Sequence, residues 1–398
     1  MRPESPRQLL VDLSELVRHD ARSGIQRVAR GLLQALQASP PSGWSVRAVY
    51  DAGGFYAYAD SDQQSGQPRY LPAAPGAEQP LQVQPGDRFL GIDLTLETVV
   101  RNEALLANLR QHGVQLYFMV YDLLPVRHPE WFVDGLANAF GHWLQAVSRL
   151  ADGLICNARA TADDLLDWLN EQPPRRARPL QLGCAALGAD LDATLPSSGI
   201  SASEAALLPR LAERPTLLMV GTLEPRKMQS QALDAAEQLW AQERDVNLVI
   251  VGKPGWRMEE LAERLHSHPE QGRRLFWLER ASDELLLRLY QDSSALLAAS
   301  HGEGYGLPLI EAAQHGLPVI ARDLAVFREV GGSHAWYFTA EDGAQLGQAL
   351  GEWLDLRAAG QAPASHAMPR LDWAASATQL LDCALEGRWY RRAPIKLL

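Results

Sequence analysis

Short apolar runs alternate with helical patterns along the chain, and this alternation constrains the fold more than any other feature. One set of strand-like runs precedes residue 190 and a second set follows residue 215. The runs occupy residues 9–13, 45–50, 88–94, 115–122, 153–157 and 179–182, and then 217–221, 247–252, 274–278, 295–300, 318–322 and 335–338. Strands that alternate with helices form parallel sheets covered by helices. The pattern therefore predicts an α/β protein of two doubly wound, Rossmann-like domains.

The length of 398 residues agrees with two domains of roughly 200 residues each. Between residues 187 and 215, Pro, Ser and small residues dilute the periodicity as a linker does, which places the boundary near Pro196. The predicted domains are residues 1–196 and 197–372. Residues 51–86 are rich in Gly, Pro, Gln and Ala and are interpreted as a loop or mobile insertion.

Composition excludes several functional classes. The formal net charge of -11 argues against a protein that coats nucleic acid, so no nucleic-acid partner is expected. The three cysteines have no metal-site spacing and fit a reducing cytosol better than a disulfide framework. Neither a signal-peptide core nor a run of about 18 apolar residues occurs in the sequence. A cytoplasmic location is expected.

Residues 301–311, HGEGYGLPLIE, form a glycine-rich bend between a strand-like run and a helical run. Glycines at such a turn let the backbone approach a ligand, and the free amides at a helix start favour an anionic group such as a diphosphate. Glu303 and Glu311 flank the bend and are able to accept hydrogen bonds from sugar hydroxyls. The alternative is a plain turn followed by a glutamate that complements the helix dipole.

A second motif, GTLEPRK at residues 221–227, follows the first strand of the second domain. Its cations emerge at the carboxyl end of a parallel sheet, where open α/β sheets bind ligands. Arg226 offers a bidentate phosphate contact and Lys227 a point charge, which together would neutralise a diphosphate leaving group. The alternative is a solvated pair of cations that opens a surface helix.

These two motifs resemble the E-x7-E signature and the G-x-x-x-x-R-K donor loop of retaining glycosyltransferases of the GT4 type. The resemblance implies a GT-B fold, in which two Rossmann-like domains face a cleft, and a last helix within 373–398 that packs back on the first domain. It also implies that Glu303, Arg226 and Lys227 are catalytic. The implied donor-binding residues are Gly304, Tyr305, Gly306, Leu307 and Glu311. Met228 stands where the family usually has glycine.

In the first domain the resemblance covers two more sites. Gly24 lies in the loop where the family offers backbone amides to the donor phosphate. The segment YDLLP resembles the family's H-D-L-x-P loop, with Tyr121 at the position of the histidine that contacts the donor sugar. A tyrosine is able to hydrogen-bond a hydroxyl but not to shuttle protons near neutral pH. Asp122 either binds acceptor hydroxyls or caps the following turn.

The resemblance thus implies a retaining hexosyltransferase that uses a nucleotide diphosphate sugar and a saccharide or lipid-linked saccharide acceptor. The short motifs GIQR, YDLLP and GTLEPRK are most similar to those of transferases that build bacterial mannose-containing surface polysaccharides. This similarity favours GDP-mannose over a UDP-sugar. No metal or other cofactor is expected, because the two cations serve as the phosphate clamp. The alternatives are a sugar-nucleotide epimerase of the same fold and a non-catalytic sugar-nucleotide-binding subunit.

The tail combines arginines with aromatic residues in the run RWYRR at residues 388–392. This combination suits anionic lipid headgroups as well as it suits a solvated terminus. Peripheral contact with the inner face of a membrane is therefore one of two hypotheses for this segment.

Overall fold

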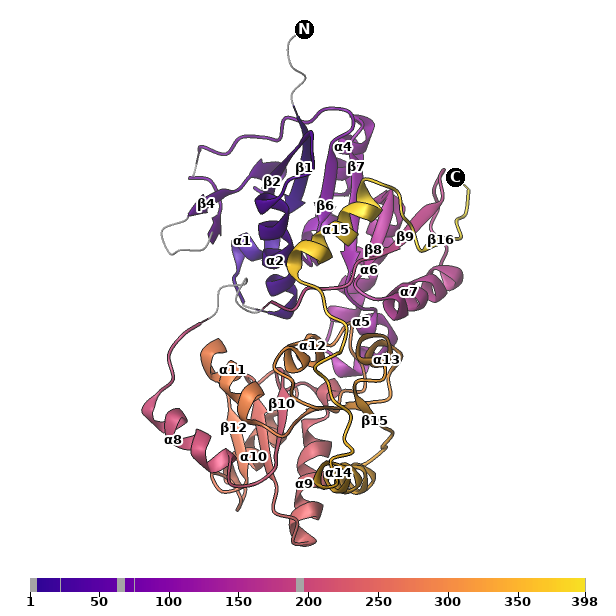
Figure 1. The fold of residues 1–398 in the computed structure, drawn as a ribbon. Coiled ribbons are helices and arrows are strands. Elements are labelled where there is room, and N and C mark those ends of the chain that lie inside the picture. Colours follow the sequence, from indigo (N-terminus) through magenta and orange to yellow (C-terminus); the bar gives the residue numbers. More distant parts are fainter. Residues whose placement is uncertain (1–5, 22, 63–68, 75, 191–196, 398) are drawn as a thin grey trace. The chain divides into compact units, whose positions relative to one another are not determined.

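A computed structural model describes residues 6–21, 23–62, 69–74, 76–190 and 197–397, and its contacts divide the chain into two compact units (Figure 1). The first unit comprises Met1–Arg127, Gly135–Gly188 and Leu371–Leu398. The second comprises His128–Asp134 and Ala189–Arg370. The boundary expected at Pro196 lies outside the described residues. Both units are α/β structures built on largely parallel sheets.

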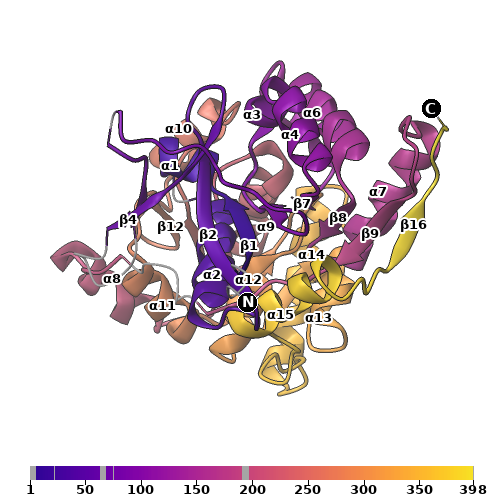
Figure 2. The ribbon, with the colours of Figure 1, turned by 90° about the horizontal axis from the view of Figure 1, so that it is seen from above.

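The first unit contains an 8-stranded sheet in the order β16-β9-β8-β7-β6-β1-β2-β3, of which β3 and β16 are antiparallel to their neighbours. Helices α2 and α15 cover one face, and α3, α4 and α6 cover the other (Figure 2). The strands are β1 Arg7–Asp12, β2 Trp44–Asp51, β3 Tyr56–Tyr58, β4 Asp60–Asp62, β5 Arg69–Leu71, β6 Arg88–Gly91, β7 Gln115–Val120, β8 Gly153–Cys156, β9 Leu180–Cys184 and β16 Arg391–Ala393. The helices are α1 Ser14–Arg18, α2 Gly24–Ala38, α3 Leu96–Arg101, α4 Glu103–Gln111, α5 Leu124–Arg127, α6 Leu136–Leu150, α7 Arg159–Glu171 and α15 Trp373–Ala384.

The second unit contains a 6-stranded, wholly parallel sheet in the order β12-β11-β10-β13-β14-β15. Its strands are β10 Thr216–Val220, β11 Asn247–Val251, β12 Leu275–Leu278, β13 Ala295–Ala298, β14 Val319–Arg322 and β15 Trp336–Phe338. Its helices are α8 Ala202–Leu211, α9 Gln229–Ala241, α10 Glu259–Ser267, α11 Asp283–Asp292, α12 Leu307–Gln314, α13 Ala325–Gly331 and α14 Gly343–Ala358. Short 3-10 helices span Pro129–Trp131 and Pro225–Lys227. The strand order reverses between β10 and β13, which is the point where open α/β sheets bind ligands.

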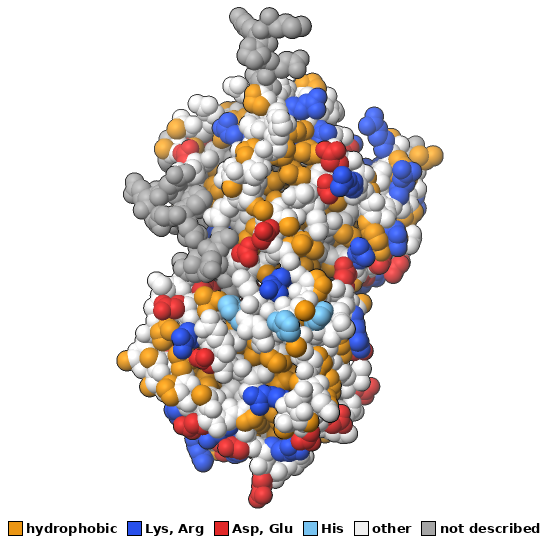
Figure 3. All heavy atoms as spheres, viewed as in Figure 1, with side chains coloured by type: hydrophobic (Ala, Val, Ile, Leu, Met, Phe, Trp, Pro, Cys, Tyr) orange, Lys and Arg blue, Asp and Glu red, His pale blue; other side chains and the backbone are white. Residues whose placement is uncertain are grey.

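Each sheet is covered by a hydrophobic core of its own. In the first unit, strand residues such as Phe89 and Phe118 pack with Trp143 and Leu144 of α6. In the second, α9 and α14 pack against each other, and Trp353 of α14 is fully buried. On the faces drawn in Figure 3, acidic and basic side chains are interspersed over each unit. Within the described residues, no helix combines the length and the apolar character needed to cross a bilayer.

The expectation that residues 51–86 form a loop or mobile insertion was wrong for part of that segment. The segment contains β3, which pairs with β2, and the separate two-stranded sheet of β4 and β5. These strands are three residues long. Strands this short leave no room for a repeating side-chain pattern, so the surrounding Gly and Pro hid them in the sequence.

The tail at residues 388–392 also contains a strand. β16 pairs antiparallel with β9. The Trp389 ring stacks on Tyr117, with centroids 5.8 Å apart, and packs against Gly153 of β8. The tryptophan is therefore used in packing within the first unit, whereas Arg391 and Arg392 remain exposed.

Helix α15 packs on α2, and one of the contacts is made by the large side chain of Trp373. Trp373 is 4% exposed, and its ring lies so close to Gly31 of α2 that a Cβ at that glycine would fall inside van der Waals contact. Because the indole has no room to retreat, Gly31→Ala is expected to lower the free energy of unfolding by about 1 to 3 kcal/mol. Urea denaturation of the purified protein measures this change.

A matched control is Gly141→Ala in α6, where the new Cβ would meet only Val126 at 3.7 Å. That substitution is expected to stabilise the protein by roughly 0.5 to 1 kcal/mol, because alanine is the better helix former. Equal effects of the two substitutions would contradict the packing of Trp373 on Gly31.

Candidate active site

The candidate site lies in the second unit, where the loops that follow β10 and β13 meet. The loop after β10 carries Arg226 and Lys227, and the loop after β13 carries Glu303. The backbone N–H of His301 donates to the carbonyl of Arg226 at 2.8 Å, which ties the two loops together. β10 and β13 are neighbouring parallel strands, so their carboxyl ends bring these residues to one edge of the sheet.

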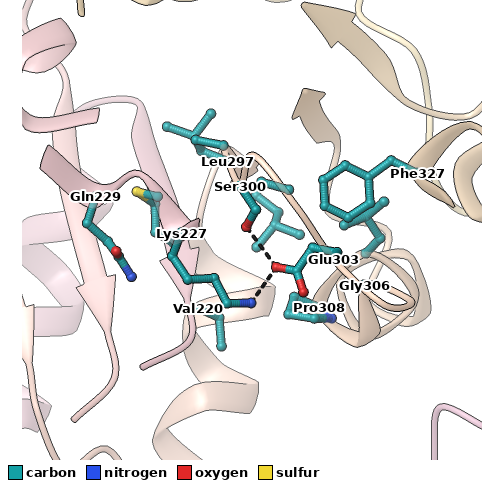
Figure 4. A pocket seen from close by; sticks show the side chains of 14 residues that line it. Val220, Lys227, Gln229, Leu297, Ser300, Glu303, Gly306, Pro308 and Phe327 are labelled. Carbon is teal, nitrogen blue, oxygen red and sulfur yellow. Dashed lines mark hydrogen bonds and ion pairs between the residues drawn. The ribbon is translucent and has the colours of Figure 1, made fainter. Parts of the chain in front are cut away.

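Glu303 accepts hydrogen bonds at both carboxylate oxygens. Arg226 Nη1 donates to Oε2 at 3.0 Å, and Ser300 Oγ donates to Oε1 at 2.7 Å. Lys227 Nζ contacts the same Oε1, so the lysine and the serine converge on one oxygen (Figure 4). The Glu303 side chain is only 12% exposed. The arrangement fixes the position of the carboxylate.

The charge state of Glu303 follows from these contacts. Burial alone would raise its pKa, but the charges of Lys227 and Arg226 and the hydrogen bonds from Lys227 and Ser300 outweigh that effect and lower the pKa to about 2. Glu303 is therefore an anion at neutral pH. It is suited to accept hydrogen bonds and unsuited to donate a proton.

Arg226 is held by contacts on three sides. Its Nη1 also donates to the carbonyl of Gly302 at 3.0 Å, and its Nε lies 2.9 Å from Glu224 Oε2. The side chains of Arg226 and Glu224 are 16% and 10% exposed. The two carboxylates and the two cations of the cluster balance one another in charge. Sequence reasoning missed Glu224 and Ser300, although both stand within three residues of a predicted site residue.

The backbone at residue 228 has a conformation that favours glycine. Met228 has φ +59° and ψ +33°, in the left-handed region, and directly precedes α9. This conformation costs a non-glycine residue roughly 1 to 2 kcal/mol. The side chain packs against the core of the unit, which offsets part of that cost.

The helix that follows Glu303 begins at Leu307, with Gly306 as its N-cap. Gly306 has φ +95°, and a Cβ there would lie 2.7 Å from the Phe327 ring, so both conformation and space require glycine. Gly304 and Tyr305 lie in the same turn. The turn places the amides of these residues at the start of an α-helix, which favours an anionic ligand.

Glu311 is in α12 and is 3% exposed. Its Oε2 accepts a hydrogen bond from the hydroxyl of Tyr290 in α11 at 2.7 Å. Tyr290, which sequence reasoning missed, is fully buried and stacks on His315. Glu311 thus lies on the buried side of α12.

A small cavity lies beneath the ion pair of Lys227 and Glu303 (Figure 4). Its volume of about 20 Å³ is large enough for a water molecule but not for a nucleotide sugar. Val220, Leu297 and Pro308 are among its lining residues. The cavity belongs to the floor of the site.

The segment His128–Asp134 groups with the second unit, although the residues on either side of it belong to the first. Trp256 Nε1 donates to the carbonyl of Trp131 at 2.8 Å, and the His128 ring stacks on Trp131 with centroids 3.9 Å apart. The centroid of Trp131 lies 6.4 Å from that of His301. This brings an aromatic side chain close to the loop that carries Glu303.

The remaining predicted residues lie in the first unit. Gly24 opens α2 and is exposed, next to a capping box formed by Ser23 and Gln26. The Tyr121 hydroxyl donates to the carbonyl of Ile92 in the interior, so toward a sugar hydroxyl its oxygen is left to act as an acceptor. Asp122 Oδ1 accepts from the N–H of Leu124 at 3.0 Å, at the start of α5. Roles of these residues toward a sugar stay predictions.

Within the described residues, no group of three or more His, Cys, Asp or Glu side chains is arranged to hold a metal ion. The candidate site brings together the carboxylates of Glu224 and Glu303, the cations of Arg226 and Lys227, backbone amides and nearby aromatic rings.

Two Rossmann-like units are typical of the GT-B class. Solved structures of that class have the same fold as this chain. The crystal structure of Anabaena Alr3699/HepE in complex with UDP and glucose matches with a TM-score of 0.64 at 14% identity, covering 94% of this chain and 98% of that one. The catalytic domain of starch synthase IV from Arabidopsis thaliana, bound to ADP and acarbose, matches with a TM-score of 0.64 at 13% identity, covering 96% and 99%. The fold is GT-B.

Sequence comparison finds similarity to known glycosyltransferases. Residues 207–367 match the family described as glycosyl transferases group 1. It is 43% identical over 378 residues to the serotype-specific mannosyltransferase WbdA of Escherichia coli, covering 94% of this chain and 44% of the relative. It is 33% identical over 208 residues to the phosphatidyl-myo-inositol mannosyltransferase of Mycobacterium leprae, covering 49% and 54%. The chain thus spans about half the length of the curated relatives that it matches.

Proposed function

We propose that the chain is a retaining glycosyltransferase of the GT4 type that moves mannose from GDP-mannose to a saccharide acceptor. The observation that carries this proposal is the buried Glu303, held between Arg226, Lys227 and Ser300 at the point where the strand order of the sheet reverses. An anionic carboxylate and two cations at that edge suit a hexose and a diphosphate together. The similarity to a mannosyltransferase favours mannose as the sugar.

Each side chain has a proposed role. Glu303 accepts hydrogen bonds from hydroxyls of the donor hexose. Arg226 and Lys227 stabilise the charge that develops on the diphosphate as the glycosidic bond breaks, together with the amides of residues 304–307. Glu311 binds the ribose of the nucleotide.

Retention is proposed to follow from attack on the same face that the diphosphate leaves. Each oxygen of Glu303 accepts at least one hydrogen bond from Arg226, Lys227 or Ser300, which lowers its nucleophilicity. We therefore favour front-face attack by the acceptor hydroxyl through an oxocarbenium-like state, with the leaving phosphate accepting its proton. The proposed reaction requires no metal, since the cations act as the phosphate clamp.

The acceptor and the location are part of the same proposal. A saccharide or lipid-linked saccharide of a bacterial surface polysaccharide is the proposed acceptor, with Gly24 on the donor phosphate and Tyr121 or Asp122 on a sugar. The enzyme would work in the cytoplasm or in peripheral contact with the inner face of the membrane. The exposed Arg391 and Arg392 are compatible with such contact.

The donor is tested by the melting temperature with GDP, UDP and ADP at matched concentrations. A ligand that binds only the folded state at 100 times its Kd adds about 2.7 kcal/mol of stability. Selective stabilisation by GDP is expected. Stabilisation by UDP alone would replace GDP-mannose with a UDP-sugar, and no shift with any nucleotide would favour a non-catalytic protein.

A further inference from the structure

Gln229 is the first residue of α9 and closely follows the two cations of the candidate site, Arg226 and Lys227. The residue is 2% exposed. Its Nε2 donates to the carbonyl of Thr222 at 3.0 Å, near the start of the loop that carries both cations. The Gln229 side chain therefore closes this loop. Gln229 has no part in the reaction proposed above.

The amide oxygen of Gln229 lacks the partner that the amide nitrogen has. Oε1 is buried and accepts no hydrogen bond from the described residues. A buried acceptor without a donor is costly, and ordered water commonly satisfies such groups in proteins. Gln229 also lines the cavity of about 20 Å³ beneath the ion pair of Lys227 and Glu303. A water molecule needs about 10 to 15 Å³ and two to four polar partners, so the cavity is large enough for one.

Two further polar side chains line this cavity and are able to bind the same water. Glu303 Oε1 is the acceptor of Lys227 Nζ within the described part of the chain, and an ammonium has further N–H bonds to donate. Ser300 Oγ donates its proton to the same carboxylate oxygen at 2.7 Å, so its lone pairs remain available to a donor. An amide oxygen, an ammonium and a hydroxyl match the roughly three hydrogen bonds that a buried water makes.

The course of the lysine side chain brings Nζ back to the start of its own loop. A Cβ added at Gly221 would lie 3.4 Å from Lys227 Cε and 3.5 Å from Nζ, so the side chain passes over this glycine. Gly221 precedes Thr222, whose carbonyl binds the Gln229 amide. The ammonium and the amide are thus held beside adjacent residues, and both side chains are among those that line the cavity in Figure 4.

We propose that Gln229 is a positioning residue for Lys227 and acts through one water molecule in the cavity. The water accepts a hydrogen bond from Lys227 Nζ and donates to Gln229 Oε1 and to Ser300 Oγ. With one N–H bond on Glu303 and another on the water, the ammonium directs its remaining N–H bond at the donor diphosphate. A group that is already oriented needs no rearrangement when charge develops on the leaving group. This inference rests on the proposed function, in which Lys227 binds that diphosphate.

The water is tested without a donor and without activity. A crystal structure of the full chain, at a resolution that defines ordered waters, is expected to show one water within hydrogen-bond distance of Gln229 Oε1 and Lys227 Nζ. Gln229→Met keeps the approximate size of the side chain and removes both polar atoms, so the structure of this variant should lack the water. Electron density that shows no water in the cavity of the unaltered protein would overturn the proposal.

A double-mutant cycle tests whether Gln229 acts through the lysine. GDP is the probe, because it carries the diphosphate that is released in the proposed reaction, and its Kd is measured by calorimetry. Gln229→Met is expected to weaken GDP binding about tenfold, the effect of one oriented charge-assisted hydrogen bond. In a Lys227→Met background the same substitution should change the Kd by less than about twofold. Equal weakening in both backgrounds would show a merely structural role and overturn the proposal.

Gln238→Met is the matched control for the cycle. Gln238 lies further along α9, beside Gly347 of α14. The control should bind GDP like the unaltered protein and keep the water, and melting temperatures without ligand check that each variant is folded. If the unaltered protein binds no GDP, the proposed donor is wrong, and the crystal structure still decides whether a water joins Gln229 to Lys227.

Discussion

Replacement of Glu303 by glutamine is expected to lower kcat/KM for sugar transfer by about 100-fold or more, the range seen when one preorganised polar group is lost from an active site. The amide nitrogen of glutamine is a donor. In either orientation of the amide it would face another donor, either Arg226 or the pair of Lys227 and Ser300. Arg226→Ala and Lys227→Ala are expected to lose most turnover as well. Initial rates with radiolabelled GDP-mannose measure these effects.

Glu270→Gln is the matched control for this prediction. Glu270 also pairs with an arginine, Arg274, at 2.9 Å, and its side chain is 15% exposed. It lies before β12 and away from the edge that carries Glu303. The control should keep its activity, and near-native turnover of the Glu303→Gln variant would remove Glu303 from the mechanism.

The same variant has a readout that is independent of catalysis. The pKa of Glu303 is lowered from 4.5 to about 2 in the folded state, so its contribution to stability is present above pH 4.5 and is lost as the pH falls toward 2. The Glu303→Gln variant should lack this part of the acid dependence. Urea denaturation between pH 5 and pH 2 compares the two proteins.

Replacement of Asp12 by asparagine is expected to raise the free energy of unfolding at pH 8 by about 2 to 4 kcal/mol. Burial raises the pKa of Asp12 from 3.8 to about 7, so its contribution to stability is present below pH 3.8 and is lost as the pH rises through 7. Asparagine keeps an oxygen for the N–H and Oγ of Ser14, which both donate to Asp12 Oδ1. It carries no charge to bury.

Asp87→Asn is the control for this second prediction. Asp87 is as buried as Asp12, but it accepts hydrogen bonds at both oxygens, from the N–H of Gln8 at 2.8 Å and that of Gln84 at 2.9 Å. An amide there leaves one donor facing another, so the Asp87→Asn variant should lose stability. If the Asp12→Asn variant gains no more at pH 8 than at pH 4, the raised pKa is contradicted.

The parallel strands were predictable because strands buried on both faces are continuous apolar runs, as in Leu217–Val220. The same topology explains why motifs distant in the sequence, at Arg226 and Glu303, come together. The strands β3 and β16 were missed, because edge strands depend on backbone pairing with β2 and β9 rather than on a side-chain pattern.

Contacts between side chains were harder to predict than motifs. Tyr290 on Glu311 and Ile92 on Tyr121 are partners brought together only by packing between separate elements. A resemblance to a family predicts which residue stands at a functional position, but the orientation of its side chain depends on the neighbouring residues. The interior hydrogen bond of Tyr121 illustrates this, because a histidine at the same position would have a different reach.

The division of the first unit into separate stretches of chain has a consequence for biosynthesis. Residues 371–398 are made after the whole of Ala189–Arg370, yet they supply Trp373 to α2 and β16 to the edge of the first sheet. During translation the second unit is therefore complete while α2 and β9 still lack their covering segments. Chaperones that recognise exposed apolar surface would therefore bind the first unit on the ribosome, because it is the unit that still lacks part of its fold.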